Sequence, residues 1–312
     1  MNNVLVVGGA GFIGSSLCER FLKDGNRVVC VDNLMRGKIE NLNGIINKRN
    51  FRFIEMDVNE LERLEQIVCE EKITHIVHLA ANSDIQASAG NPQIEFDCTM
   101  KTTWSILLTM KKTGVKNLFF ASTSAVYGQM IHESFDEEDV LNPISYYGGA
   151  KMASEAFIRS FSFMNDFNVL IFRFPNVIGP HLTHGVFFDF INRLRKNPTC
   201  LTVLGNGTQC KPYMHVYDLI EAIVSLFWEN KGVNTYNVGV ETATSVKTIA
   251  NMVVQEMHLP NCKIVYGKTN EGWKGDVPKF AYSLKKIYST GWKASMTSDE
   301  AALATIKEAL KK

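Results

Sequence analysis

The chain has 312 residues, with 33 Lys and Arg against 32 Asp and Glu, so its formal net charge is +1. Hydrophobic residues make up 46% and charged residues 21%, which is close to average globular usage and excludes a disordered chain. The balanced charge argues against a nucleic-acid-binding protein, which usually has a concentrated basic surface. The sequence contains neither an apolar run long enough to span a membrane nor a signal peptide pattern.

The seven cysteines are odd in number and scattered, and none forms a C-x-x-C pair. This usage is typical of a reducing compartment, so we expect a cytoplasmic protein without disulfides. His181 and His184 flank a Gly/Pro-rich loop with no cysteine nearby. We therefore expect no metal site.

The first half of the chain alternates short apolar strands with helical stretches. Strands are predicted at residues 3–7, 27–31, 51–54, 74–79, 115–121 and 169–172. Helices are predicted at residues 12–23, 61–69, 92–112 and 145–164. This alternation predicts an α/β fold with a doubly wound parallel sheet of the Rossmann type.

After residue 174 the spacing loosens, and loops containing Gly and Pro separate shorter elements. This pattern predicts a smaller C-terminal α+β lobe. We expect two domains, residues 1–174 for a dinucleotide and residues 175–312 for the substrate, partly interleaved.

Residues 8–14, Gly-Gly-Ala-Gly-Phe-Ile-Gly, follow the first strand and open the first helix. Gly8 makes a tight turn, Gly11 lets the backbone approach a pyrophosphate, and Gly14 permits close packing of helix on strand. The helix N-terminus then faces the anion. The motif therefore predicts a dinucleotide-binding turn.

The second predicted strand is followed by Asp32. A carboxylate there accepts hydrogen bonds from both ribose hydroxyls and repels a 2′-phosphate, which favours NAD over NADP. Arg36 and Lys38 lie nearby, and their positive charges favour the 2′-phosphate of NADP instead.

Tyr147 and Lys151 are four residues apart in a predicted helix, with Ser145 as a candidate N-cap. Sharing one helix face lets the ammonium stabilise a phenolate. Free tyrosine titrates near pH 10, so a base working near neutrality needs a pKa lowered by about three units. We expect Lys151 and a positively charged nicotinamide to lower it.

A hydroxyl-rich segment, residues 121–128, follows the fifth predicted strand, where side chains point into the ligand crevice of such folds. With this segment in place, the sequence resembles the extended short-chain dehydrogenases/reductases of the NAD-dependent sugar-nucleotide epimerase/dehydratase group. The similarity runs through residues 8–14, 122–128, 147–151, 173–180, 204–209, 215–218 and 275–276.

The resemblance implies that Thr123 is the catalytic hydroxyl, acting with Tyr147 and Lys151. The residues that it assigns to NAD, besides Tyr147 and Lys151, are Gly8, Gly11, Phe12, Ile13, Gly14, Asp32, Asn33, Asp57, Val58, Leu79, Ala80 and Ala81. The residues that it assigns to the substrate are Ser83, Thr123, Ser124, Asn176, Val186, Lys211 and Asp276.

Subgroups of this family differ directly after the catalytic hydroxyl. The 4,6-dehydratases carry an Asp-Glu pair there, and sugar-acid decarboxylases typically carry a glutamate, whereas this chain has Ser124 and Ala125. We therefore expect simple oxidation at the sugar's C4 carbon rather than elimination of water.

The chain departs from the family pattern at three positions, two in the substrate lobe and one in the first domain. Lys211 and Trp273 stand where the family usually has arginines, and Thr99 stands where it has an asparagine. Lysine keeps the charge but loses the bidentate fork, and Lys274 is a candidate replacement for the second arginine. The identities of the base and the sugar stay open.

The sequence thus predicts an NAD-dependent oxidoreductase acting at C4 of a nucleotide-activated sugar, most simply a 4-epimerase. The alternatives are a 4-dehydrogenase that releases a 4-keto sugar while a second oxidant recycles NADH, a 4,6-dehydratase, and a non-catalytic NAD-sensing protein. We expect a homodimer that pairs helices 92–112 and 145–164, with no nucleic-acid or membrane partner.

Overall fold

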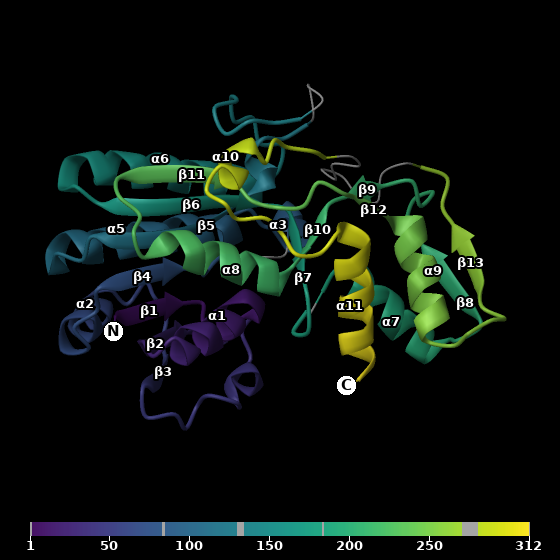
Figure 1. Ribbon diagram of the computed structural model, residues 1–312, viewed down its shortest axis with the longest axis horizontal. Coiled ribbons are helices and arrows are strands. Elements are labelled where there is room, and N and C mark those ends of the chain that lie inside the picture. Colours follow the sequence, from purple (N-terminus) through teal and green to yellow (C-terminus); the bar gives the residue numbers. More distant parts are fainter. Residues whose placement is uncertain (1, 83–84, 130–133, 183, 270–279, 312) are drawn as a thin grey trace. The chain divides into compact units, whose positions relative to one another are not determined.

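Seven strands form the main sheet (Figure 1), in the order β11-β6-β5-β4-β1-β2-β3. The strands are β1 Asn3–Val7, β2 Arg27–Asp32, β3 Phe51–Glu55, β4 His75–His78, β5 Asn117–Thr123, β6 Asn168–Phe174 and β11 Val233–Asn237. The pairs β1–β2, β1–β4, β2–β3 and β4–β5 are parallel. The computed structural model describes residues 2–82, 85–129, 134–182, 184–269 and 280–311.

Helices cover both faces of this sheet, which explains why its strands are almost continuously apolar. They are α1 Phe12–Lys23, α2 Leu61–Glu70, α3 Ile85–Gly90, α4 Gln93–Glu95, α5 Lys101–Thr113 and α6 Tyr146–Asn165. One core cluster joins Leu64 of α2, Ile106 of α5 and Ile158 of α6 to one face. On the other face, Phe21 of α1 packs edge-on against Trp228.

The chain divides into two compact units. The first contains residues 1–126, 141–173 and 220–236, and the second contains residues 127–140, 174–219 and 237–312. The chain first passes from one unit to the other at residues 126–127 and does so again at residues 173–174. The units are not continuous in sequence: residues 127–140 belong to the second unit, and residues 220–236 return to the first. The return at residue 220 falls inside helix α8, Val216–Phe227.

The described part of the second unit contains three two-stranded sheets and a helical core. Its strands are β7 Asn176–Ile178, β8 Cys200–Val203, β9 Cys210–Lys211, β10 Tyr213–His215, β12 Thr244–Ser245 and β13 Lys263–Tyr266. Its other helices are α7 Val186–Lys196, α9 Val246–Glu256, α10 Lys285–Tyr288 and α11 Ser298–Leu310. Phe190, Ile249 and Ile306 join α7, α9 and α11 in one apolar cluster.

The predicted α/β Rossmann fold is confirmed, and β1 and α1 have the predicted bounds. The helix expected at residues 92–112 is present as a continuous helical run, in which a π-helical segment, Phe96–Met100, joins α4 to α5. At this segment the hydroxyls of Thr102 and Thr103 both donate to the Thr99 carbonyl, at 2.9 Å. None of the helices described here is long and apolar enough to cross a bilayer.

Candidate active site

The glycine turn brings the ends of β1 and β4 together, at the point where the strand order reverses. Gly8 has φ +83°, and a Cβ there would lie 2.7 Å from the backbone nitrogen of Ala80. A Cβ at Gly14 would lie 2.3 Å from the Gly8 carbonyl oxygen. Only glycine fits these two positions. In open α/β sheets, ligands bind where the strand order reverses, so this turn lies at the expected place for a ligand.

Helix α1 starts from this turn with Gly11 as its N-cap. Because glycine has no side chain, no capping group covers the first-turn amides, which include those of Phe12 and Ile13. A helix start of this kind binds anions through its N–H groups and its dipole. The backbone therefore suits the pyrophosphate of a dinucleotide.

Asp32 ends β2 beside the same turn. Its carboxylate oxygens accept the backbone N–H groups of Ala10 at 3.0 Å and Leu34 at 2.8 Å. Burial raises the pKa of this carboxyl, and the two N–H groups lower it. Each oxygen has a second lone pair, so the carboxylate keeps the capacity to accept ribose hydroxyls. Arg36 donates to the Asn82 side-chain oxygen at 3.2 Å.

The remaining candidate cofactor residues follow β2, β3 and β4. Asn33 donates to Asp57 at 3.1 Å, which joins the segments after β2 and β3, and Val58 is buried beside them. The Leu79 amide donates to the Val7 carbonyl at 2.9 Å, so the chain leaves β4 alongside the end of β1. Leu79, Ala80 and Ala81 are half-buried there.

The candidate catalytic hydroxyl, that of Thr123, lies at the end of β5, which runs two residues further than predicted. The Thr123 hydroxyl accepts the Ala125 N–H at 3.2 Å and is hydrogen-bonded to the Tyr147 hydroxyl. Ser124 begins the short 3-10 turn Ser124–Val126. The beginning of α6 packs closely there, since a Cβ at Gly148 would lie 2.5 Å from the Ala125 carbonyl oxygen.

Helix α6 carries the tyrosine and the lysine, and its predicted N-cap is confirmed, since the Ser145 side chain accepts the Gly148 N–H. Lys151 is 2% exposed, and its ammonium donates to the Ala121 carbonyl at 2.7 Å. Its Nζ lies 4.7 Å from the centroid of the Phe120 ring and 6.0 Å from that of Tyr147. Burial lowers the pKa of Lys151 to about 7, although Glu95 and Glu155 act to raise it.

The electrostatics of Tyr147 differ from the expectation. Burial raises the pKa of its phenol above the ordinary value, the charge of Glu95 raises it further, and only the hydrogen bond to Thr123 lowers it. Lys151, which donates to a backbone carbonyl on β5, is not among the groups that shift this pKa. A phenolate at this site is therefore a strong base that forms only with further stabilisation.

The buried carboxylates around this pair were not predicted from the sequence. Glu155 accepts two hydrogen bonds from Arg173, at 3.0 and 2.7 Å, and a third from Ser122. Glu95 is buried on α4 and accepts the Thr99 hydroxyl. The available signals were spacings: Glu155 lies four residues after Lys151, and Glu95 four before Thr99.

The candidate substrate residues are distributed over both units. Asn176 is exposed at the start of β7, Val186 begins α7, and Lys211 pairs with Thr244 across β9 and β12. Four positions named in the sequence analysis lie outside the described residues: Ser83, Trp273, Lys274 and Asp276.

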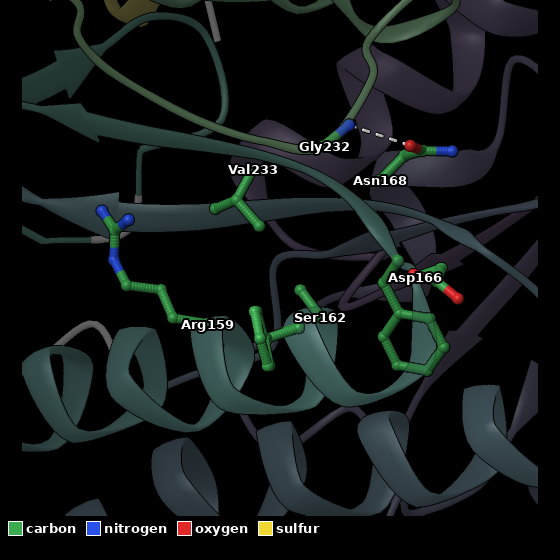
Figure 2. A pocket seen from close by; sticks show the side chains of 8 residues that line it. Arg159, Ser162, Asp166, Asn168, Gly232 and Val233 are labelled. Carbon is green, nitrogen blue, oxygen red and sulfur yellow. Dashed lines mark hydrogen bonds between the residues drawn. The ribbon is translucent and has the colours of Figure 1, made fainter.

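A surface depression of about 720 Å³ lies elsewhere on the first unit (Figure 2). Arg159 and Ser162 of α6 line one side, and Val233 lines another. The Gly232 N–H donates to the Asn168 side chain there at 2.9 Å. The depression lies where β6 and β11 begin, and it contains none of the candidate residues.

The glycine turn, the acid that ends β2 and the Thr-Tyr-Lys group are typical of an extended short-chain dehydrogenase/reductase with a Rossmann sheet. Within this class, the chain belongs to the NAD dependent epimerase/dehydratase family, whose model matches residues 4–239.

Two relatives and one solved structure show how broad this family is. The chain is 30% identical over 264 residues to UDP-glucose 4-epimerase of Mycolicibacterium smegmatis, covering 82% of this chain and 83% of the relative. It is 28% identical over 316 residues to dTDP-D-glucose 4,6-dehydratase of Mus musculus, covering 97% of this chain and 87% of the relative. A crystal structure of UDP-galactose 4-epimerase matches with a TM-score of 0.87 and 33% identity over 99% of both chains.

Proposed function

We propose that the protein is an NAD-dependent sugar-nucleotide 4-epimerase. The observation that carries the proposal is the group of Thr123, Tyr147 and Lys151 at the end of β5 and the start of α6. The glycine turn fits NAD sterically, and Asp32 fits its adenosine ribose. NAD, when bound, supplies a hydride acceptor for C4 of the sugar and the hydride that returns to it.

The residues of this chain divide the proton chemistry among them. Thr123 orients the 4-hydroxyl through a hydrogen bond and holds the oxygen of Tyr147. Tyr147, as the phenolate, accepts the proton of that hydroxyl and later returns it. Lys151 lies on the same face of α6 and would bind the nicotinamide ribose, while the positive charge of bound NAD would supply the further stabilisation that the phenolate needs.

The segment after Thr123 supports epimerisation over dehydration. Loss of water across C5 and C6 needs a base for the C5 proton and an acid for the departing hydroxyl. Ser124 and Ala125 occupy the two positions after Thr123, and neither carries an acid or a base. The proposed chemistry therefore stays at C4.

The test is to incubate the purified protein and its Tyr147→Phe variant with UDP-, GDP-, CDP- and dTDP-sugars. Products are followed by NMR and NADH by absorbance. We expect a C4 epimer without accumulation of NADH. Stoichiometric NADH with a 4-keto sugar would indicate a dehydrogenase, and a 4-keto-6-deoxy sugar a dehydratase. No conversion of any sugar nucleotide would remove the proposal.

We propose further that two copies pair through α5 and α6. The fractional exposure is 41% for Trp104, 38% for Phe157, 86% for Phe163 and 76% for Met164, an apolar surface of the kind that marks interfaces. The Trp104 ring contacts the Phe157 ring with centroids 5.2 Å apart. Light scattering should give a dimer mass at micromolar protein, and Trp104→Glu should give a monomer. A monomeric wild type would exclude this interface.

A further inference from the structure

Glu155 and Arg173 form a buried ion pair one helical turn beyond Lys151, and the proposed mechanism does not use it. Each of the two residues is 2% exposed. The guanidinium donates from Nε to one carboxylate oxygen at 3.0 Å and from Nη2 to the other at 2.7 Å, and the Ser122 hydroxyl donates to the first oxygen as well. Replacing a buried ion pair by apolar side chains is often neutral for stability, so stability alone does not explain this one.

The ion pair lies where the apolar face of the sheet ends. Phe120 of β5 and Ile171 of β6 belong to the core cluster that Ile158 of α6 joins. Because side chains on one face of a strand recur at every second residue, Ser122 and Arg173 continue this same face toward the carboxyl ends of the two strands. The sheet therefore presents polar groups to α6 close to the candidate active site.

Helix α6 is held in two different ways along its length. Its C-terminal half buries Ile158 in the core cluster. Its N-terminal half buries Lys151 and Glu155, which hydrogen bonds hold in place. Apolar contacts have no preferred direction, whereas hydrogen bonds and two-pronged ion pairs fix both distance and angle. The half of the helix that carries Tyr147 is therefore the half with a fixed register on the sheet.

Three consecutive residues at the end of β5 each bind one residue of α6. The three pairs are Ala121 with Lys151, Ser122 with Glu155, and Thr123 with Tyr147. The middle pair is also joined to the neighbouring strand, because Glu155 binds Arg173 of β6. A helix that is tied to two adjacent strands cannot slide along one of them without breaking a contact to the other.

We propose that Glu155 and Arg173 are positioning residues whose ion pair fixes α6 on β5 and β6. The link holds the Tyr147 hydroxyl within hydrogen-bonding reach of Thr123, where the sugar's 4-hydroxyl has to bind. The inference deepens the proposed function and rests on it for its catalytic meaning. Misplacing a reacting group by about 1 Å can cost about 10²-fold in rate, so a contact outside the site can control the chemistry.

The first test is the double variant Glu155→Met with Arg173→Met. Both charges are removed together, so no unpaired charge stays buried and the melting temperature should remain near that of wild type. Single-turnover hydride transfer at saturating NAD and sugar nucleotide should fall about 10²-fold. The half-saturating concentrations should change much less, because the glycine turn and Thr123 are intact. A wild-type transfer rate, or a loss confined to the half-saturating concentrations, would overturn the proposal.

Glu71→Gln is the control for a loss of stability alone. Glu71 is buried and binds Arg27, whose Nε lies at 3.0 Å, and Arg52, near the amino ends of β2 and β3. This variant should lower the melting temperature but leave the transfer rate at saturation near that of wild type. Glu155→Gln should lower both, because it leaves the Arg173 charge buried without its partner carboxylate. Equal losses of rate in the two variants would overturn the proposal.

A further test does not depend on activity. Hydrogen–deuterium exchange is measured by mass spectrometry for residues 146–153 and 156–165 of α6 in protein without sugar nucleotide. In the double variant the first segment should exchange faster than in wild type, whereas the second, which Ile158 anchors in the core, should not change. An unchanged first segment, or equal acceleration of both, would overturn the proposal.

Ser122→Ala tests the same link if the double variant does not fold. It removes the hydroxyl that joins β5 to Glu155 and leaves the ion pair with Arg173 in place. Faster exchange confined to residues 146–153 is expected again, and exchange as in wild type would overturn the proposal. Because no sugar nucleotide is present, either exchange result stands even if the sugar-nucleotide panel shows no conversion.

Discussion

The glycine turn and the proposed catalytic pair, Tyr147 and Lys151, lie in the same unit, but they depend on different physical effects. The turn is built by sterics, because Gly8 and Gly14 leave no space for a Cβ. The proposed catalytic pair depends on burial and charge, because burial and the charges of Glu95 and Glu155 set the pKa of Lys151. Changes in size should therefore damage the first region, and changes in charge or pH the second.

This contrast also separates binding from chemistry. The turn uses backbone amides, which carry no titratable proton, so its affinity for a pyrophosphate should vary little with pH. The pair contains an ammonium whose pKa burial lowers to about 7 and a phenol whose pKa burial raises. The pH dependence of the reaction should therefore come from the pair.

The largest effect is expected from Tyr147→Phe, which removes the proposed base. Single-turnover hydride transfer should fall by about 10²- to 10⁴-fold, the usual loss when general-base catalysis is removed. NAD binding and stability should change little, because one hydroxyl is lost and the turn is untouched. Thr123→Val should lose less, since the adjacent Ser124 keeps a hydroxyl nearby. Transfer at the wild-type rate in Tyr147→Phe would mean that another group is the base.

Gly14→Ala tests the steric region. The new Cβ would lie 2.3 Å from the Gly8 oxygen, so the turn has to shift. We expect a loss of about 2–3 kcal/mol in the free energy of unfolding, as for overpacked sites, together with weaker NAD binding. Gly149→Ala is the control, because a Cβ at this glycine of α6 meets nothing within 4 Å. It should stabilise the helix by about 0.5–1 kcal/mol. Urea unfolding measures the change in stability of both variants. If the two substitutions changed the free energy of unfolding in the same direction, the steric account would be contradicted.

His75, a buried histidine outside the candidate active site, should make the stability of the protein depend on pH. Burial and the nearby Lys231 lower the pKa of His75 to about 4, against 6.5 for the free side chain. Between these values the unfolded chain binds more protons, so stability is full above pH 6.5 and is lost as pH falls through 4. When the pH falls from 7 to 4.5, the free energy of unfolding should decrease by about 2 kcal/mol more in wild type than in His75→Gln. Urea unfolding at both pH values measures it, and parallel losses would contradict the shift.

Asp32→Ala should give the smallest effect, a change in cofactor preference. The carboxylate faces the expected ribose, so its loss should weaken NAD binding by about tenfold and narrow the preference over NADP. Calorimetry with NAD and with NADP measures the two affinities. The melting temperature of the variant shows whether the loss of the hydrogen bonds from Ala10 and Leu34 has destabilised the fold. Tighter binding of NADP than NAD by the wild type would reject the assignment of Asp32.

The sequence alone determined the features that depend on short spacings. The glycine turn, the acid ending β2, the Ser145 cap and the pairing of Tyr147 with Lys151 all follow from residues a few positions apart or at the ends of predicted strands. Apolar periodicity likewise predicted the alternating strands and helices of the sheet. These features were readable because backbone geometry fixes which near neighbours share a turn or a face.

The tertiary structure decided how charge is distributed around the pair. Glu95 acts on Lys151 although 56 residues separate their numbers, and the carbonyl that binds Lys151 belongs to Ala121, 30 residues away. The π-helical segment that joins α4 to α5, which the periodicity did not predict, lies directly after Glu95. Burial sets the pKa values of Tyr147 and Lys151, and burial is a property of the packed chain. The spacing therefore indicated the candidate pair, whereas packing decided the proton affinities of its two members.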